Sequence, residues 1–296
     1  MKKLLSFSLT LCLLALLGGC AGQASPGAQT GSSLVPLAPA EEITYEVVTD
    51  RFEDSIYSDD GETLLMTISF ALPRLQAFSD GVLIETPDTA VQTEAMERAA
   101  AFNDAFAQWE DAQASEEYIQ IARDWYAAAP ESFSGEYGGY FGEELTFTSY
   151  RTGSLISVAA TYYSFLGGAH PNTVYLSWNF DLDSGTFLTI PELATNPQTF
   201  TLAVADMIEA QAAEQFRDDP DFGGLPISDI YWPDYRETME KWGSDYAASF
   251  DADGLTVIFS AYELAPYAAG AQEFHFPYSS LDRYWSDSGR AALGLD

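Results

Sequence analysis

The chain has 296 residues, of which 45 are acidic and 12 are basic, and its formal net charge at pH 7 is −33. A negative field of this size repels nucleic acids and other polyanions and speeds encounter with cationic partners, although it also serves solubility alone. The two cysteines, Cys12 and Cys20, both precede residue 21, so thiol catalysis, disulfide bonds and Cys-ligated zinc are excluded from the rest of the chain.

The N-terminus has the layout of an export signal. Lys2 and Lys3 precede an apolar run over residues 4–17, and two glycines follow it, which is typical of a secretory signal. The run is too short for a comfortable membrane span. We therefore expect a signal peptide over residues 1–19.

A lipid anchor is predicted at the end of this signal. Residues 17–20, Leu-Gly-Gly-Cys, resemble a bacterial lipobox, in which Cys20 receives lipid and becomes the mature N-terminus. Two or more acyl chains anchor a protein stably to a membrane. The alternative is an ordinary signal in which this cysteine is a coincidence. Residues 20–40, rich in Gly, Ser, Pro and Ala, predict a flexible tether on the outer side of the cell membrane.

The next hundred residues indicate strands followed by helices. Residues 43–48 alternate apolar and polar side chains as a half-buried strand does, and residues 62–72 predict a second strand that Pro73 stops. Apolar residues recur at helical spacing over residues 93–126, which predicts two helices with a break near Ser115. Their aromatic residues fall on one face, so we expect core packing rather than a sugar platform.

From residue 143 the pattern returns to strands. Residues 145–151, 155–163 and 173–180 predict an antiparallel meander, and residues 200–216 an amphipathic helix. A hairpin follows over residues 246–259; its acidic turn lacks the ligands of a calcium loop. The predicted fold is α+β, with antiparallel sheets and helices packed on them, in two consecutive small domains over residues 41–150 and 151–296.

The loop over residues 167–172, Gly-Gly-Ala-His-Pro-Asn, stands out from its aromatic surroundings. Two glycines permit positive φ and close approach, and Pro171 stiffens the exit. On local chemistry alone the pattern favours a tight turn between strands.

The sequence nominates no catalytic, metal or cofactor residue. Only two histidines are present, and Gly-x-Ser-x-Gly, phosphate-loop and dinucleotide motifs are absent. A zinc site from His170, His275 and Glu263 is conceivable, but no short ligand pair supports it. Paired carboxylates for glycoside hydrolysis can be neither nominated nor excluded among 45 acidic residues.

Three segments carry a family resemblance. Residues 167–170, 179–193 and 254–270 are similar to the pattern of a domain of unknown function. That domain forms the C-terminal extracytoplasmic part of RsiV-type anti-sigma factors, which sense lysozyme. A smaller partner domain, also found at the N-terminus of PdaC-type peptidoglycan deacetylases, commonly precedes it. Residues 41–150 fit this partner by position and by strand and helix content.

The resemblance implies a binding module without catalysis of its own. Its expected partners are the membrane, through the lipid, and lysozyme or another cationic protein, or peptidoglycan, but not nucleic acid. No expectation of signalling to a sigma factor is carried over, because the chain has a predicted lipid anchor and no transmembrane or cytoplasmic segment.

The expected recognition surface comprises the two glycine-containing loops of the resemblance. The predicted binding residues are Gly168, His170, Pro171, Asn172, Tyr262, Glu263, Pro266 and Tyr267. Two alternatives stay open: both segments only form turns, with Tyr262 and Glu263 buried, or the protein is a peptidoglycan-directed enzyme or enzyme accessory that uses His170 and Glu263.

Overall fold

In a computed structural model of the chain, the structure describes residues 41–133, 139–217 and 222–295. The predicted signal, Cys20 and the tether lie outside these residues. The described part is α+β: two sheets built almost wholly of antiparallel pairs, with helices packed on them, as predicted. Within it, no helix combines the length and apolar character that crossing a bilayer requires.

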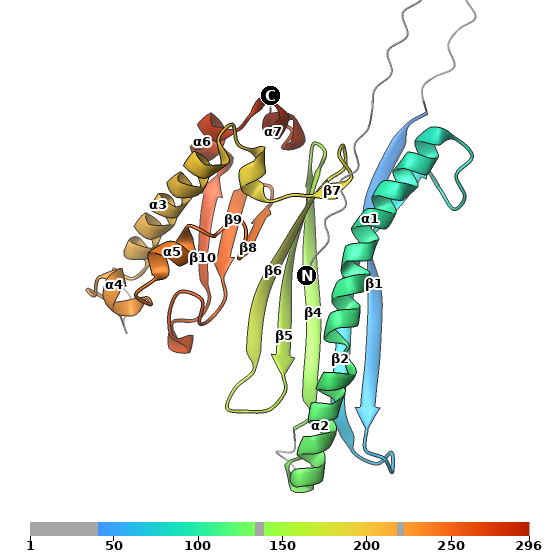
Figure 1. The fold of residues 1–296 in the computed structure, drawn as a ribbon, viewed down its shortest axis with the longest axis vertical. Coiled ribbons are helices and arrows are strands. Elements are labelled where there is room, and N and C mark those ends of the chain that lie inside the picture. Colours follow the sequence, from blue (N-terminus) through green and yellow to red (C-terminus); the bar gives the residue numbers. More distant parts are fainter. Residues whose placement is uncertain (1–40, 134–138, 218–221, 296) are drawn as a thin grey trace, which may run out of the picture. The chain divides into compact units, whose positions relative to one another are not determined.

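Neighbouring strands of the larger sheet follow one another in the order of the chain, except that the short third strand pairs with the second outside this order (Figure 1). Its strands are β1 (Ile43–Tyr57), β2 (Leu64–Ser79), β3 (Val82–Leu83), β4 (Phe141–Thr152), β5 (Leu155–Phe165), β6 (Asn172–Asp181) and β7 (Thr186–Phe187). The predicted meander is confirmed as the antiparallel strands β4, β5 and β6. The helices between β2 and β4 carry the chain across to a parallel β2–β4 pair, which the sequence did not predict.

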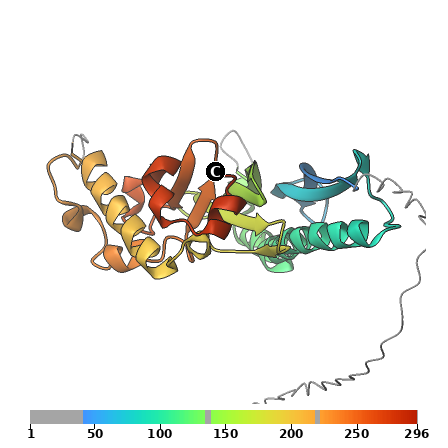
Figure 2. The same cartoon turned by 90° about the horizontal axis from the view of Figure 1, so that it is seen from above.

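Two helices cover one face of this sheet. They are α1 (Ala90–Gln113) and α2 (Glu116–Ala128), followed by a 3-10 turn, η1 (Pro130–Phe133). Ser115 lies between the two helices at the N-cap position of α2, without a side-chain capping hydrogen bond, so the predicted break is confirmed. Figures 1 and 2 show α1 lying along β1 and β2. The α1 aromatics pack on the sheet: Phe70 meets Trp109 edge-on, with ring centroids 5.2 Å apart, which supports their interpretation as core residues.

Pro73 does not end β2, contrary to the prediction. Leu75 and Ala77 direct their backbone groups away from β1, to Asn103 and Ile84. Because backbone groups alternate along a strand, the Pro73 nitrogen faces this same side. The pairing of β2 with β4 has already ended at Phe70, so the missing N–H of Pro73 breaks no ladder hydrogen bond.

The smaller sheet has the order β10–β9–β8. Its strands are β8 (Ala247–Phe250), β9 (Gly254–Phe259) and β10 (Gln272–Pro277), which confirms the predicted hairpin. The predicted amphipathic helix is α3 (Pro197–Gln215), which lies along β10 in Figure 1. Short helical elements complete this part: η2 (Ile190–Leu193), α4 (Ile227–Ile230), α5 (Tyr235–Met239), η3 (Tyr267–Ala269), α6 (Tyr278–Leu281), η4 (Asp282–Tyr284) and α7 (Asp287–Ala292).

Polar side chains of the large sheet join it to the free edge of β8. Ser177 Oγ accepts the Ala248 N–H at 2.8 Å, and Asn179 Nδ2 donates to the Ala248 carbonyl at 2.9 Å. Ser157 Oγ accepts the Phe250 N–H at 2.8 Å. These side chains satisfy backbone groups that a neighbouring strand would otherwise satisfy, which explains why such polar residues are buried here.

Two hydrophobic cores underlie these sheets. One contains buried residues from Ile56 to Leu182; apart from Leu155, the other contains residues from Ile190 to Leu293. The predicted boundary at residues 150/151 lies inside β4, which pairs with β5 across it. The chain passes between the cores at residues 182–190, while residues Glu41–Asp296 form one compact unit by backbone contacts.

Candidate functional site

The two loops singled out in the sequence, 92 residues apart at His170 and Tyr262, meet in the structure. The His170 ring stacks on Tyr267, with ring centroids 3.9 Å apart and an interplanar angle of 18°. Tyr262 lies beside both, with its centroid 6.2 Å from that of His170 and 5.4 Å from that of Tyr267. We call these three side chains the loop cluster. All three are exposed.

Hydrogen bonds hold the His170 ring in this cluster. Nδ1–H donates to the Pro171 carbonyl at 2.9 Å, and Nε2 forms a hydrogen bond of 3.3 Å with the Tyr262 hydroxyl. The Tyr267 hydroxyl donates to the same Pro171 carbonyl at 3.4 Å. Both ring nitrogens therefore form contacts, one within the first loop and one to the second.

The path of the first loop depends on glycine. Gly167 has φ +93°, and a Cβ there would lie 3.1 Å from the Trp125 ring and 3.2 Å from Phe141. Gly168 has φ +100° but faces open space. Both backbones are unfavourable for other residues, and Gly167 also needs the absence of a side chain. The loop thus turns against α2 before it reaches His170.

The second loop holds a strained residue. Tyr262 has φ +76°, a left-handed conformation that costs residues other than glycine about 1–2 kcal/mol relative to the right-handed region. Trp232 clamps it: the indole Nε1–H donates to the Tyr262 carbonyl at 2.9 Å, and the Trp232 N–H donates to the Leu264 carbonyl at 2.8 Å. The surrounding structure therefore holds the backbone of the second loop in this conformation at Tyr262.

Glu263 faces the loop and not the surface of the cluster. Its carboxylate accepts the Ser260 backbone N–H, and the Ser260 hydroxyl accepts the Tyr175 N–H at 3.1 Å. Burial raises the pKa of Glu263, and the hydrogen bonds from Ser260 oppose this only in part. The carboxylate thus ties the second loop to β6, which is a structural task.

The other predicted binding residues lie around the cluster. Gly168, Asn172 and Pro266 are exposed, and Pro171 is half-buried between them and His170. Trp232 is a member that the sequence prediction missed; its signal was the run Tyr231-Trp232-Pro233 in a polar loop. Only Trp232 of that pair of aromatics is accessible, at 36% exposure, whereas Tyr231 is 4% exposed.

The second histidine and the acidic turn both form local hydrogen bonds in the structure. His275 lies on β10, where Nδ1 is 3.2 Å from the Thr256 hydroxyl, and no group of three or more His, Cys, Asp or Glu side chains among the described residues is placed to hold a metal. The acidic turn at Asp251 is closed by its own carboxylate, which accepts the N–H groups of Asp253 and Gly254.

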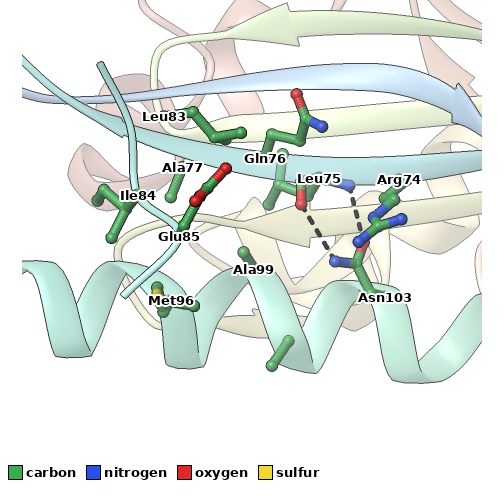
Figure 3. A pocket seen from close by; sticks show the side chains of 11 residues that line it. Arg74, Leu75, Gln76, Ala77, Leu83, Ile84, Glu85, Met96, Ala99 and Asn103 are labelled. Carbon is green, nitrogen blue, oxygen red and sulfur yellow. Dashed lines mark hydrogen bonds between the residues drawn. The ribbon is translucent and has the colours of Figure 1, made fainter. Parts of the chain in front are cut away.

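A cavity of about 390 Å³ lies between β2 and α1, and Asn103, one of its lining residues, bonds to the backbone of β2 (Figure 3). Asn103 Oδ1 accepts the Leu75 N–H at 2.7 Å, and Asn103 Nδ2 donates to the Leu75 carbonyl at 3.1 Å. The amide thus replaces a partner strand at the edge of β2. The small side chains of Ala77 and Ala99 leave the gap, so we interpret this cavity as a consequence of packing.

Comparisons with known proteins bear on the second half of the chain. Residues 195–279 match the family model described as "Protein of unknown function (DUF3298)". No curated protein matches the chain in sequence.

Two solved structures align with most of the chain. A DUF3298 family member from Bacteroides fragilis aligns with a TM-score of 0.52 and 18% identity, over 86% of this chain and 98% of its own. A DUF3298 family protein from Pseudomonas aeruginosa aligns with a TM-score of 0.40 and 17% identity, over 84% and 96% respectively. The first likeness shows a shared fold. The chain therefore carries a DUF3298 family domain over residues 195–279, on a fold already known from that family.

Proposed function

We propose that this protein is a lipid-anchored, extracytoplasmic binding protein whose loop cluster takes a cationic protein partner of the lysozyme type. The observation that carries the proposal is the convergence of two distant loops into one exposed aromatic surface around His170. The resemblance to RsiV-type domains supports the same reading, because those domains sense lysozyme.

Rigid, exposed aromatic rings suit protein recognition. Tyr262 is 51% exposed and Tyr267 is 38% exposed, and with Trp232 they offer large contact areas. Tyrosine and tryptophan dominate binding hot spots, since they bury much surface and lose little side-chain entropy. The strain at Tyr262 and its clamp by Trp232 hold the cluster ready before binding.

The charge of the chain selects the partner class. Lys2 and Lys3 lie in the predicted signal, so ten basic residues oppose 45 acidic ones after residue 19, a net charge of −35. Such a surface attracts a basic protein by long-range steering, and salt weakens this attraction. The aromatic cluster would supply contact affinity, and the field would supply encounter rate.

The same geometry argues against the enzyme alternative with His170 and Glu263. The two His170 nitrogens are engaged by Pro171 and Tyr262, and the Glu263 carboxylate by the Ser260 backbone. A general acid or base needs a reacting group within hydrogen-bond reach; His170 would have to give up one of these contacts first, and the Glu263 carboxylate is turned toward the Ser260 backbone.

Calorimetry with hen-egg-white lysozyme at low and moderate salt tests the proposal. We expect the full chain to bind, with weaker binding at moderate salt, and Tyr262→Ala to weaken binding by about 2 kcal/mol or more, as hot-spot truncation does. Tyr57→Ala is the matched control, since Tyr57 is 50% exposed but lies at the end of β1. Absence of binding at both salts, or equal losses in the two variants, would contradict the proposal.

A further inference from the structure

A second cavity lies on the face of the large sheet that α1 and α2 leave uncovered. Its volume is about 420 Å³. Thr67 and Ser69 of β2, Glu144 of β4 and Tyr163 of β5 line it, with Tyr140 at its rim. The strand register places these residues together: Ser69 pairs with Glu144, and Glu144 pairs with Tyr163. Because paired residues share a face of a sheet, their side chains converge on one hollow.

Gly142 forms the floor of this cavity. It pairs with Thr67 on one side and Phe165 on the other, and a Cβ there would lie 3.5 Å from Thr67 Oγ1. The hollow therefore exists because Gly142 lacks a side chain. Its φ lies outside the positive region, so a larger residue could enter without backbone strain.

Glu143 also lines the cavity, but its carboxylate accepts a hydrogen bond from Tyr162, whereas the other polar side chains of the lining are unused. None of Thr67, Ser69, Glu144, Tyr140 and Tyr163 forms a side-chain hydrogen bond or ion pair with another described residue. In the cavity beside α1, by contrast, the polar side chains already have partners. Asn103 forms hydrogen bonds with the Leu75 backbone, and Arg74 forms an ion pair of 3.4 Å with Asp50. Small-molecule sites combine aromatic and apolar walls with a few polar groups that can bond to the ligand.

The lining chemistry narrows the ligand class. No Lys or Arg lines the cavity, so a phosphate or another anion has no counter-charge. Two hydroxyls and a carboxylate make it too polar for a lipid chain. Two accessible tyrosine rings, 51% exposed at Tyr140 and 38% at Tyr163, offer flat apolar faces. Flat faces together with hydroxyl and carboxylate groups match the C–H face and the hydroxyls of a pyranose ring.

We propose that this cavity is a saccharide-binding subsite for a neutral pyranose oligosaccharide. Tyr140 and Tyr163 would stack on sugar faces, while Glu144, Thr67 and Ser69 would bond to hydroxyls. The volume lies within the range of roughly 300–1,000 Å³ that small-molecule sites occupy. The subsite shares no lining residue with the loop cluster, although β5, which carries Tyr163, pairs with β6, which begins just after His170.

Saturation-transfer NMR with the full chain and millimolar triacetylchitotriose or cellotriose tests the subsite. We expect transfer to the sugar ring protons, an affinity loss of about tenfold in Tyr163→Ala from the lost stacking, and a loss in Gly142→Val, which fills the floor. Tyr150→Ala is the matched control, because Tyr150 is 37% exposed on the same sheet but lies outside the cavity.

Further arms separate this proposal from others. Glu144→Gln changes no volume, so it reports on the carboxylate in a folded protein and should weaken sugar binding. Tyr262→Ala should leave sugar binding intact, which makes the outcome independent of the protein-binding proposal. Transfer to neither neutral sugar, equal transfer in wild type and Tyr163→Ala, or binding confined to the cationic chitosan trimer would overturn the assignment.

Discussion

The His170 ring lies parallel to that of Tyr267, with 3.9 Å between their centroids, although the two residues come from loops 97 positions apart in the chain. This stack joins a turn of the large sheet to the loop that follows β9. The hydrogen bond from Tyr262 to His170 adds a second link. The histidine thus contributes two of the contacts between the two loops.

Replacing His170 should loosen this connection. We expect His170→Ala to lower the free energy of unfolding by about 1 kcal/mol, the usual contribution of one aromatic pair, and to weaken partner binding. Chemical denaturation measures the first effect. His275→Ala, at an exposed position on β10, is the control; an equal loss there would show that the loop contacts of His170 contribute nothing specific.

The two loop glycines allow strain and steric conflict to be separated. Gly167→Ala and Gly168→Ala should both lower the free energy of unfolding by roughly 1–2 kcal/mol, because both backbones have positive φ. Gly167→Ala should lose more, since its Cβ would press on Trp125 and Phe141 whereas Gly168 faces open space. Thermal melting of the two variants measures this difference. Equal losses of stability would show that the Trp125 ring moves aside without cost.

Much of this fold follows from local patterns in the sequence. The helices with their break at Ser115, the β4–β6 meander and the β8–β9 hairpin were all predicted from periodicity and turn residues. The parallel β2–β4 pair was missed because it depends on how the intervening helices return the chain. The continuation of β2 beyond Pro73 was missed because it depends on which edge of β2 has no partner strand at that position.

The candidate site was predictable only in part. The glycines and His170 mark the first loop, and the family resemblance points to the second. That Trp232 clamps Tyr262, and that Glu263 bonds to the loop backbone, depend on contacts between distant residues that no local spacing encodes. The cavity above Gly142 likewise depends on the register of three strands.

Glu143 should give the stability of this protein an unusual pH dependence. It is 2% exposed; burial raises its pKa, and the hydrogen bond from Tyr162 opposes this only in part, while Oε2 has no partner among the described residues. The folded state therefore holds this proton more tightly than the unfolded state. Its contribution to stability is fully present below the unfolded pKa, about 4.3, and is lost as the pH rises through the folded value.

Glu143→Gln mimics the protonated acid and should remove this loss. We expect the variant to exceed the wild type in unfolding free energy at neutral pH, and the difference to shrink toward about pH 4. Urea denaturation across this range measures it. A wild type whose stability rises more steeply with pH than that of Glu143→Gln would contradict the assignment.

Asn103 should stabilise the edge of β2. Removing its amide in Asn103→Ala leaves the Leu75 N–H and carbonyl without partners in a partly buried place, which costs about 1–3 kcal/mol. Asn103→Asp keeps the acceptor for the Leu75 N–H and loses only the donor, so its stability should lie between that of the wild type and that of Asn103→Ala. Denaturation midpoints for the three proteins check this order, and an alanine variant as stable as the wild type would refute it.

The central claim is that the His170 and Tyr262 loops form one recognition surface for a cationic protein. Hydrogen–deuterium exchange with and without hen-egg-white lysozyme tests it most directly. The account predicts slower exchange on binding at residues 166–172 and 261–270 together, with little change along β1. Protection elsewhere with both loops unchanged, or protection of neither loop, would contradict it.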